Sequence, residues 1–140
     1  MKKRILLVDD DIALLGIMKI LLEQSGYVVK AVHRGSEAVR LFLASPQSFD
    51  LVILDQAMPD LQGTEIAQRF TLLRPGLPIL LYTGSLDDDL ATMARKIGVK
   101  EVASKSLTGE ELLDVIVRTL DTQRGPLELS GQWGAASTSL

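Results

Sequence analysis

Four large apolar residues lie between two aspartates in the run Asp50-Leu51-Val52-Ile53-Leu54-Asp55. A second run, Ile5-Leu6-Leu7-Val8, ends in the same way, at the acidic cluster Asp9-Asp10-Asp11. Such continuous hydrophobicity is typical of strands that are buried on both faces of a parallel sheet. Because a carboxylate is unfavourable beside buried apolar residues, the acidic ends of these two runs indicate a function for the aspartates.

The rest of the chain alternates between runs of strand character and stretches of helical spacing. Strands are predicted at 4–8, 27–32, 50–54, 77–82 and 100–103, and helices at 36–44, 64–73 and 86–97. Two apolar stripes predict the first and last helices, and their members are Ile12, Leu15, Met18 and Leu22, then Leu112, Leu113, Ile116, Val117 and Leu120. Right-handed crossovers then give an α/β fold, a doubly wound parallel sheet with helices on both faces.

Several polar residues have simpler structural roles. Thr108 and Glu111 have the spacing of a capping box at the start of the last helix. Asp11 is expected to cap the first helix, and Asp87-Asp88-Asp89 to supply negative charge at the start of the fourth. His33 is the only histidine, and we expect it to be a solvent-facing loop residue.

Length, composition and charge exclude several classes of function. The chain has 140 residues, 46% of them apolar, and a net charge of −3, so no strong electrostatic footprint for nucleic acid or anionic lipid is expected. It contains no cysteine, which excludes disulfides and thiolate metal sites. No stretch reaches the roughly 20 apolar residues of a membrane span, and the basic start lacks the long apolar run of a signal peptide. A cytoplasmic location is therefore the expectation.

A change of character after Leu120 sets the expected domain boundary. Arg124-Gly125-Pro126 would break a helix, and the residues that follow have no period. We therefore expect one domain over 1–122 and a flexible tail, or the stub of a linker, over 123–140. Trp133 is the only tryptophan and falls in this tail.

Polar side chains gather at the predicted carboxyl ends of the strands. Asp9 and Asp10 follow the first strand, Asp55 the third, Thr83 ends the fourth, and Lys105 comes soon after the fifth. These ends meet at one edge of a parallel sheet, which is where ligands bind. A divalent cation such as Mg²⁺ would relieve the repulsion between crowded carboxylates. An aspartate there could attack a phosphoryl group, whose oxygens the metal, Lys105 and Thr83 would hold.

These residues resemble the receiver domain of two-component response regulators, over about Lys3 to Leu120. The resemblance is carried by four motifs in order: Leu7-Val8-Asp9-Asp10, Asp55 with Met58-Pro59 and Gly63, Thr83-Gly84, and Lys105. The resemblance implies a flavodoxin-like (βα)5 fold with a five-stranded sheet in the order 2-1-3-4-5. It also implies a signalling domain that catalyses its own phosphorylation and dephosphorylation.

The resemblance also implies a role for each matching residue. Asp55 would accept a phosphoryl group from a phosphohistidine of a sensor histidine kinase or histidine phosphotransfer protein. Mg²⁺ would be held by three carboxylates and one main-chain carbonyl, those of Asp9, Asp10, Asp55 and Ala57. Thr83 and Lys105 would bind the phosphoryl group. The change would alter contacts with a downstream protein or an attached domain, with no nucleic acid or membrane bound by this domain. A homodimer is left open.

Two positions depart from the family pattern. Ser106 follows Lys105 where the family usually has a proline after a cis bond. Since a cis bond to serine costs roughly 3–4 kcal/mol, we expect a trans bond and a rebuilt, more mobile or differently routed loop. Val102 stands where the family commonly has a tyrosine or phenylalanine that moves inward on phosphorylation. We therefore expect phosphorylation without the usual aromatic switch.

Other readings remain open at this point. The domain could be a stand-alone regulator or the receiver of a hybrid sensor kinase, which the run from Arg74 to Gly84 resembles. A pseudo-receiver would dock to partners without being phosphorylated. A haloacid-dehalogenase-type phosphatase also uses an aspartyl nucleophile, but it needs a second aspartate two residues later. Asp9 has one at Asp11, whereas Asp55 is followed at that spacing by Ala57.

Overall fold

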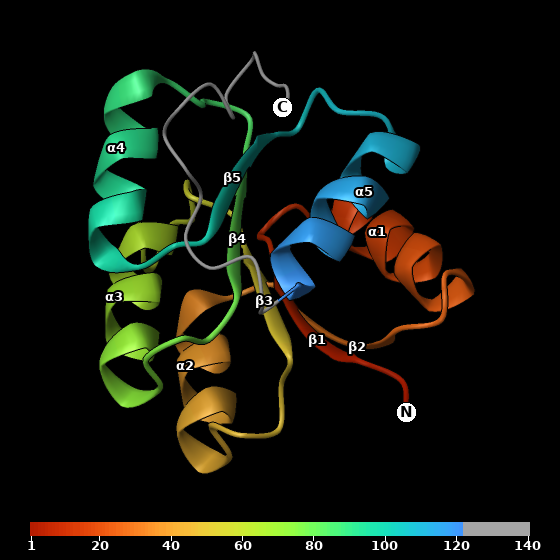
Figure 1. The fold of residues 1–140 in the computed structure, drawn as a ribbon, viewed down its shortest axis with the longest axis horizontal. Coiled ribbons are helices and arrows are strands. Elements are labelled where there is room, and N and C mark those ends of the chain that lie inside the picture. Colours follow the sequence, from red (N-terminus) through yellow and green to blue (C-terminus); the bar gives the residue numbers. More distant parts are fainter. Residues whose placement is uncertain (122–140) are drawn as a thin grey trace.

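The computed structural model describes residues 1–121, which form a five-stranded parallel sheet in the order β2-β1-β3-β4-β5 (Figure 1). The strands are β1 (Arg4–Val8), β2 (Val28–Val32), β3 (Leu51–Leu54), β4 (Ile79–Thr83) and β5 (Glu101–Ser104). The helices are α1 (Ile12–Gln24), α2 (Gly35–Ala44), α3 (Gly63–Leu73), α4 (Asp88–Ile97) and α5 (Gly109–Leu120). The predicted fold class and strand order are confirmed. The predicted tail over 123–140, including Trp133, lies outside the described residues.

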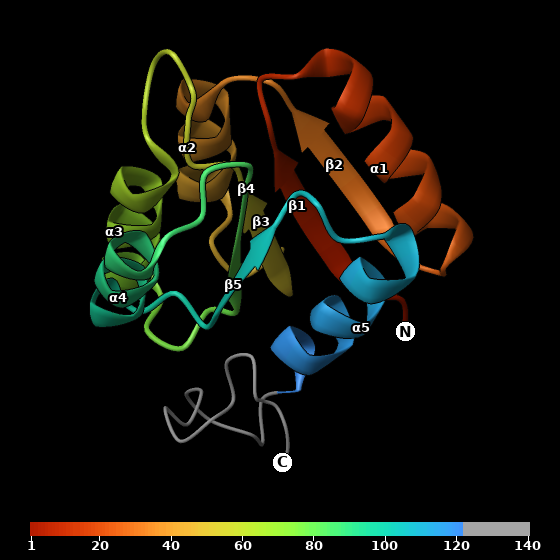
Figure 2. The same ribbon diagram turned by 90° about the horizontal axis from the view of Figure 1, so that it is seen from above.

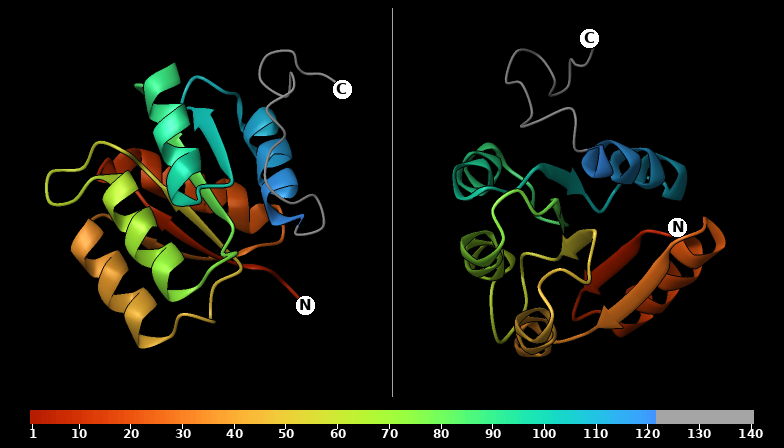
Figure 3. Two further views of the ribbon diagram at one scale, coloured as in Figure 1. Left: turned by 60° about the vertical axis from the view of Figure 1, so that its left-hand side comes forward. Right: turned by 60° about the horizontal axis from the view of Figure 1, so that its bottom comes forward.

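Helices cover both faces of the sheet. Helices α1 and α5 lie on one face, and α2, α3 and α4 lie on the other (Figure 2); Figure 3 shows these last three side by side. Alternate residues of the central strands serve the two layers, since Leu6 and Val52 pack toward α2–α4 whereas Ile5 and Ile53 pack toward α1 and α5. Both faces of the central strands are therefore buried, as continuous hydrophobicity predicted.

Burial differs from the apolar pattern of the sequence at three places. Strand β2 is not buried on both faces, because it is an edge strand and alternates between buried Val29 and exposed Lys30. Ile12 is 66% exposed, since it opens the first turn of α1 beyond the end of β1. Val117 is 60% exposed, because it lies about 100° further round α5 than the buried Ile116.

The polar residues predicted at the starts of α1, α4 and α5 do cap these helices, although α4 begins at Asp88, two residues later than predicted. Asp11 caps α1 by accepting a hydrogen bond of 3.1 Å from the Leu14 amide. Asp87 caps α4, because its carboxylate accepts a hydrogen bond of 2.8 Å from the Leu90 amide. Thr108 and Glu111 form the capping box at the start of α5. These caps satisfy amides that have no partner within the helix. Within residues 1–121 no helix is long and apolar enough to cross a membrane.

Candidate functional site

Three carboxylates converge at the carboxyl ends of β1 and β3. The strands are paired in register, Val8 opposite Leu54, and the Asp55 amide donates to the Val8 carbonyl at 2.9 Å. Asp9 directly follows Val8 at the end of β1, and Asp55 directly follows Leu54 at the end of β3. Asp9, Asp10 and Asp55 each place one carboxylate oxygen within 4.8 Å of the others. Asp9 and Asp55 are buried and Asp10 is exposed, so the cluster opens to solvent on one side.

Lys105 supplies the positive charge of the cluster. Its ammonium lies 2.8 Å from Asp9 Oδ2 and 3.1 Å from Asp55 Oδ1. Its backbone is fixed as well, since the Lys105 amide donates to the Thr83 carbonyl at 2.9 Å. Burial alone would lower the pKa of Lys105, but its hydrogen bonds to Asp9 and Asp55 outweigh burial and hold that pKa above its usual value. The lysine therefore remains charged between two buried carboxylates.

The carboxyl group of Asp55 has a raised pKa. Burial raises the pKa of its carboxyl group, the charge of Asp9 raises it further, and Lys105 only partly opposes them, so that the pKa is about 6. Without a further cation, the folded protein thus holds the Asp55 carboxylate at a cost in free energy. Three carboxylates with a single ammonium are a hard, oxygen-rich and electrostatically unsatisfied donor set, which fits Mg²⁺.

Thr83 ends β4, the strand that separates β3 from β5 in the sheet. Its side chain is buried, and its hydroxyl oxygen accepts a hydrogen bond of 3.2 Å from the Ser85 amide. Thr83 therefore lies at the same edge as Asp55 and Lys105, on the strand between them. This places each predicted phosphoryl-binding residue at the carboxyl end of its own strand.

The loop after Asp55, residues 56–62, approaches the site closely and is fastened to α3. The Gly63 amide donates to the Gln56 carbonyl at 3.0 Å, and the Gln56 side chain exchanges two hydrogen bonds with Thr64, at 2.9 and 3.1 Å. A Cβ atom on Gly63 would overlap the Asp55 carbonyl oxygen and lie 2.9 Å from Leu81 Cδ1. The motif glycine is therefore required for close approach. Ala57, the predicted carbonyl ligand, lies in this loop and is exposed.

Sequence reasoning missed two polar residues of this loop. Gln56 fastens the start of the loop to Thr64, and Asp60 reaches the first turn of α2 through Gly35 and Ser36. Their partners lie 8 to 25 residues away in the sequence. Contacts between residues so far apart leave no periodic pattern in the sequence. The only available signal was the presence of polar residues in the short segment that links Asp55 to Gly63.

The two departures from the family pattern have clear structural consequences. No peptide bond of the described residues is cis, so the trans bond expected before Ser106 is confirmed. The chain turns here because the Ser106 amide and the Leu107 amide donate to the side chain and the carbonyl of Ser104. Val102 is buried in the core layer below α4. A small aliphatic side chain therefore fills the position of the family's mobile ring.

Lys105→Met tests the electrostatic balance of the cluster. Methionine keeps much of the aliphatic stem but removes the ammonium from Asp9 and Asp55, so the metal-free protein should lose about 1 kcal/mol of unfolding free energy. Urea denaturation measures the change. Lys30→Met on the exposed edge strand is the matched control and should stay within about 0.5 kcal/mol of wild type. Equal stability of the Lys105 variant and wild type would contradict this balance.

Comparisons with known proteins agree with this geometry. The sequence model of one family, the response regulator receiver domain, matches residues 5–117. The transcriptional regulatory protein PhoP for alkaline phosphatase synthesis of Bacillus subtilis is 29% identical over 112 residues, 80% of this chain and 46% of that protein. The transcriptional regulatory protein GlrR of Escherichia coli is 31% identical over 119 residues, 84% of this chain and 26% of that protein. The chain thus spans from about a quarter to about half of the length of these relatives.

Solved structures are similar over most of their length. A CheY-like receiver domain from Methanospirillum hungatei matches with a TM-score of 0.80 and 32% identity, over 89% of this chain and 98% of that one. The DrrB receiver domain activated with BeF3 matches with a TM-score of 0.75 and 30% identity, over 86% and 98%. The family match covers well over half of the sequence and fits the fold and the acidic cluster. The chain therefore belongs to the response regulator receiver domain family.

Proposed function

We propose that this domain accepts a phosphoryl group on Asp55 and passes the signal on through altered protein contacts. The donor would be a phosphohistidine of a sensor histidine kinase or a histidine phosphotransfer protein. The observation that carries the proposal is the convergence of buried Asp55 with Asp9, Asp10 and Lys105. A downstream protein or an attached domain would read the change, and we place this exchange in the cytoplasm.

In the proposed reaction a carboxylate oxygen of Asp55 attacks phosphorus. The new O–P bond forms as the P–N bond to the donor histidine breaks, and that bond's electron pair stays on the imidazole nitrogen, which takes up a proton. Above pH 6, the Asp55 carboxyl is mostly ionised and nucleophilic. Asp55 Oδ1 lies 3.1 Å from the Lys105 ammonium, which places a positive charge beside the attacking carboxylate.

The other site residues would stabilise charge. Lys105 and the Thr83 hydroxyl would each hold a phosphoryl oxygen, since phosphoryl transfer depends mainly on positioning and charge neutralisation. Mg²⁺ would be held by Asp9, Asp10, Asp55 and the Ala57 carbonyl, and it would supply positive charge that neutralises the phosphoryl group. Because Asp9 and Asp55 are buried, the charges act at short range in a partly water-excluded site.

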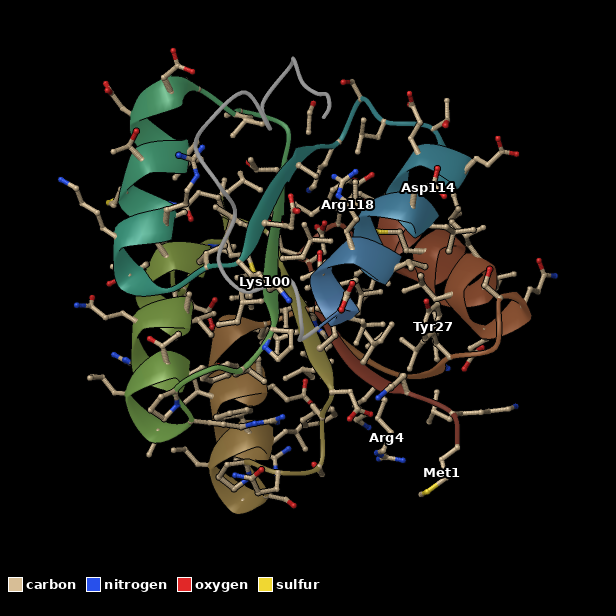
Figure 4. The ribbon with its side chains drawn as sticks, in the orientation of Figure 1. Met1, Arg4, Tyr27, Lys100, Asp114 and Arg118 are labelled. Atoms are coloured by element: carbon tan, nitrogen blue, oxygen red, sulfur yellow. The ribbon has the colours of Figure 1, made fainter. Side chains whose placement is uncertain are left out.

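Acetyl phosphate and Mg²⁺ followed by intact-mass measurement tests this function. Wild type should gain one phosphoryl group, whereas Asp55→Asn and a sample with excess chelator should gain none. Asp114→Asn, at an exposed position of α5 (Figure 4), is the matched control and should be modified like wild type. Absence of any adduct on wild type would favour a docking domain that is not phosphorylated. Repeated turnover of phosphate esters would favour an aspartyl phosphatase.

Activation should proceed without an aromatic switch. Val102 is already packed in the core below α4 and is too short to move between an inner and an outer position. Beryllium fluoride with Mg²⁺, which mimics the phosphoryl group, should therefore change amide chemical shifts next to the site, at Thr83 and Ser85, and leave those of α4 nearly unchanged. Nuclear magnetic resonance with and without the mimic measures this. A large rearrangement of α4 would refute the prediction.

A further inference from the structure

The first turn of α2 is capped from a distant part of the chain. In the described structure its N-cap residue, Arg34, makes no side-chain capping hydrogen bond. The Gly35 amide instead donates to Asp60 Oδ1 at 3.1 Å, and the Ser36 amide donates to Asp60 Oδ2 at 2.8 Å. A carboxylate at this end of a helix also interacts favourably with the helix dipole. Asp60 thus uses both oxygens to join the loop after β3 to α2.

The loop after β3 and the first turn of α2 are in direct contact at Gly35. A Cβ atom on Gly35 would lie 3.0 Å from Leu61 Cβ and 3.2 Å from Asp60 Oδ1, so a larger residue would press the loop away by a few tenths of an ångström. Asp60 Oδ1 also accepts a hydrogen bond of 2.9 Å from the Leu61 amide. These hydrogen bonds, that of Ser36 foremost, hold the pKa of Asp60 below its usual value. The carboxylate stays ionised and bonded over the physiological pH range.

The same loop is held at its other end by Gln56. The Gln56 side chain binds the backbone and the side chain of Thr64 in α3, at 2.9 and 3.1 Å. Between the two fastened residues lie only Ala57, Met58 and Pro59. Met58 is buried and Pro59 has a fixed φ, so few conformations remain for this segment. Its main-chain carbonyls are therefore set by the two attachments.

We propose that Asp60 is a positioning residue for the divalent-cation site, holding the Ala57 carbonyl in place by fastening the loop to α2. This inference rests on the proposed function, which makes that carbonyl a Mg²⁺ ligand. Residues that orient a ligand without touching the metal commonly change metal affinity 10–100-fold when they are replaced. A residue that served only as a helix cap would lower stability and leave the affinity for Mg²⁺ unchanged.

Mg²⁺ titration of the full chain by calorimetry, at about 0.15 M salt, separates these two roles. Asp60→Ala removes both acceptors and should weaken Mg²⁺ binding about tenfold. Asp60→Glu keeps the charge but moves the carboxylate by one methylene against Gly35, and should weaken binding severalfold. Asp114→Ala on α5 is the control and should bind like wild type. Hydrogen exchange at Gly35 and Ser36 should become faster in both Asp60 variants.

Each outcome decides a different claim. If wild type takes up no Mg²⁺, the proposed function fails and this inference fails with it. If wild type and Asp60→Ala bind equally while Gly35 and Ser36 exchange faster, the positioning role alone is overturned. If only Asp60→Ala is weakened and Asp60→Glu binds like wild type, the effect is one of charge and the positioning role is again overturned. Should Asp60→Ala fail to fold, the affinity of Asp60→Glu decides by itself.

Discussion

Gly63→Ala should lower the free energy of unfolding by about 3 kcal/mol or more. The added methyl group would overlap the Asp55 carbonyl oxygen and press on Leu81 Cδ1 at 2.9 Å. The first of these atoms is backbone and cannot rotate away, so the start of α3 or the end of β3 must move. Thermal and urea denaturation measure the loss. The same movement would displace Asp55, so phosphorylation by acetyl phosphate should slow as well.

Gly16→Ala is the matched control for that result. Gly16 lies in the middle of α1, and none of the described atoms comes within 4 Å of a Cβ atom built there. Alanine in an open helical position should stabilise the protein by about 0.5–1 kcal/mol through the smaller entropy of its unfolded chain. A similar destabilisation of both variants would show that close approach at Gly63 is not the cause.

Asp55→Asn should raise the unfolding free energy of the metal-free protein by about 2 kcal/mol near pH 7.5. The carboxyl group has a pKa of about 6 in the folded protein, raised from 3.8 mainly by burial and then by the charge of Asp9. Between these values the unfolded chain loses its proton first, so wild-type stability falls as pH rises through the window. Asparagine carries no charge, so its advantage should be full above pH 6, should shrink as pH falls from 6 towards 3.8, and should be absent below pH 3.8.

Urea denaturation of both proteins from pH 4 to pH 8 measures this difference. Mg²⁺ provides the internal control, because an ion bound only by the folded state stabilises it by mass action. Saturating Mg²⁺ should stabilise wild type and reduce or reverse the advantage of Asp55→Asn. A variant less stable than wild type at every pH, without metal, would contradict the raised pKa of Asp55.

The fold was predictable from its central strands. The range 4–8 predicted for the first strand is that of β1, because this run is buried on both faces and ends abruptly at charged residues. The position of β2 in the sequence was predicted correctly, but its burial was not. It is an edge strand with a single neighbour, and its Lys30 is exposed to solvent. Apolar stripes located α1 and α5, yet Ile12 and Val117 face solvent. Sequence pattern thus finds elements more reliably than it assigns each residue to a face.

Part of the candidate site was also predictable from the sequence, and part was not. The convergence of Asp9, Asp10, Asp55 and Lys105 was predictable, because parallel strands bring their carboxyl ends to one edge of the sheet. The attachment of the loop by Asp60 was not, because a carboxylate after Met58-Pro59 carries no sign of a partner 25 residues earlier in the sequence. Such long-range hydrogen bonds depend on the packing of α2 against α3, which only the folded chain defines.

The central claim is that Asp55 itself receives the phosphoryl group, and chemical trapping tests it most directly. Sodium borohydride reduces an aspartyl phosphate to homoserine, so peptide mass spectrometry after treatment with acetyl phosphate and Mg²⁺ locates the modified residue. The account predicts homoserine in place of Asp55, with Asp9 and Asp10 unchanged. Homoserine in place of Asp9 or Asp10, or none at any of the three positions, would contradict it.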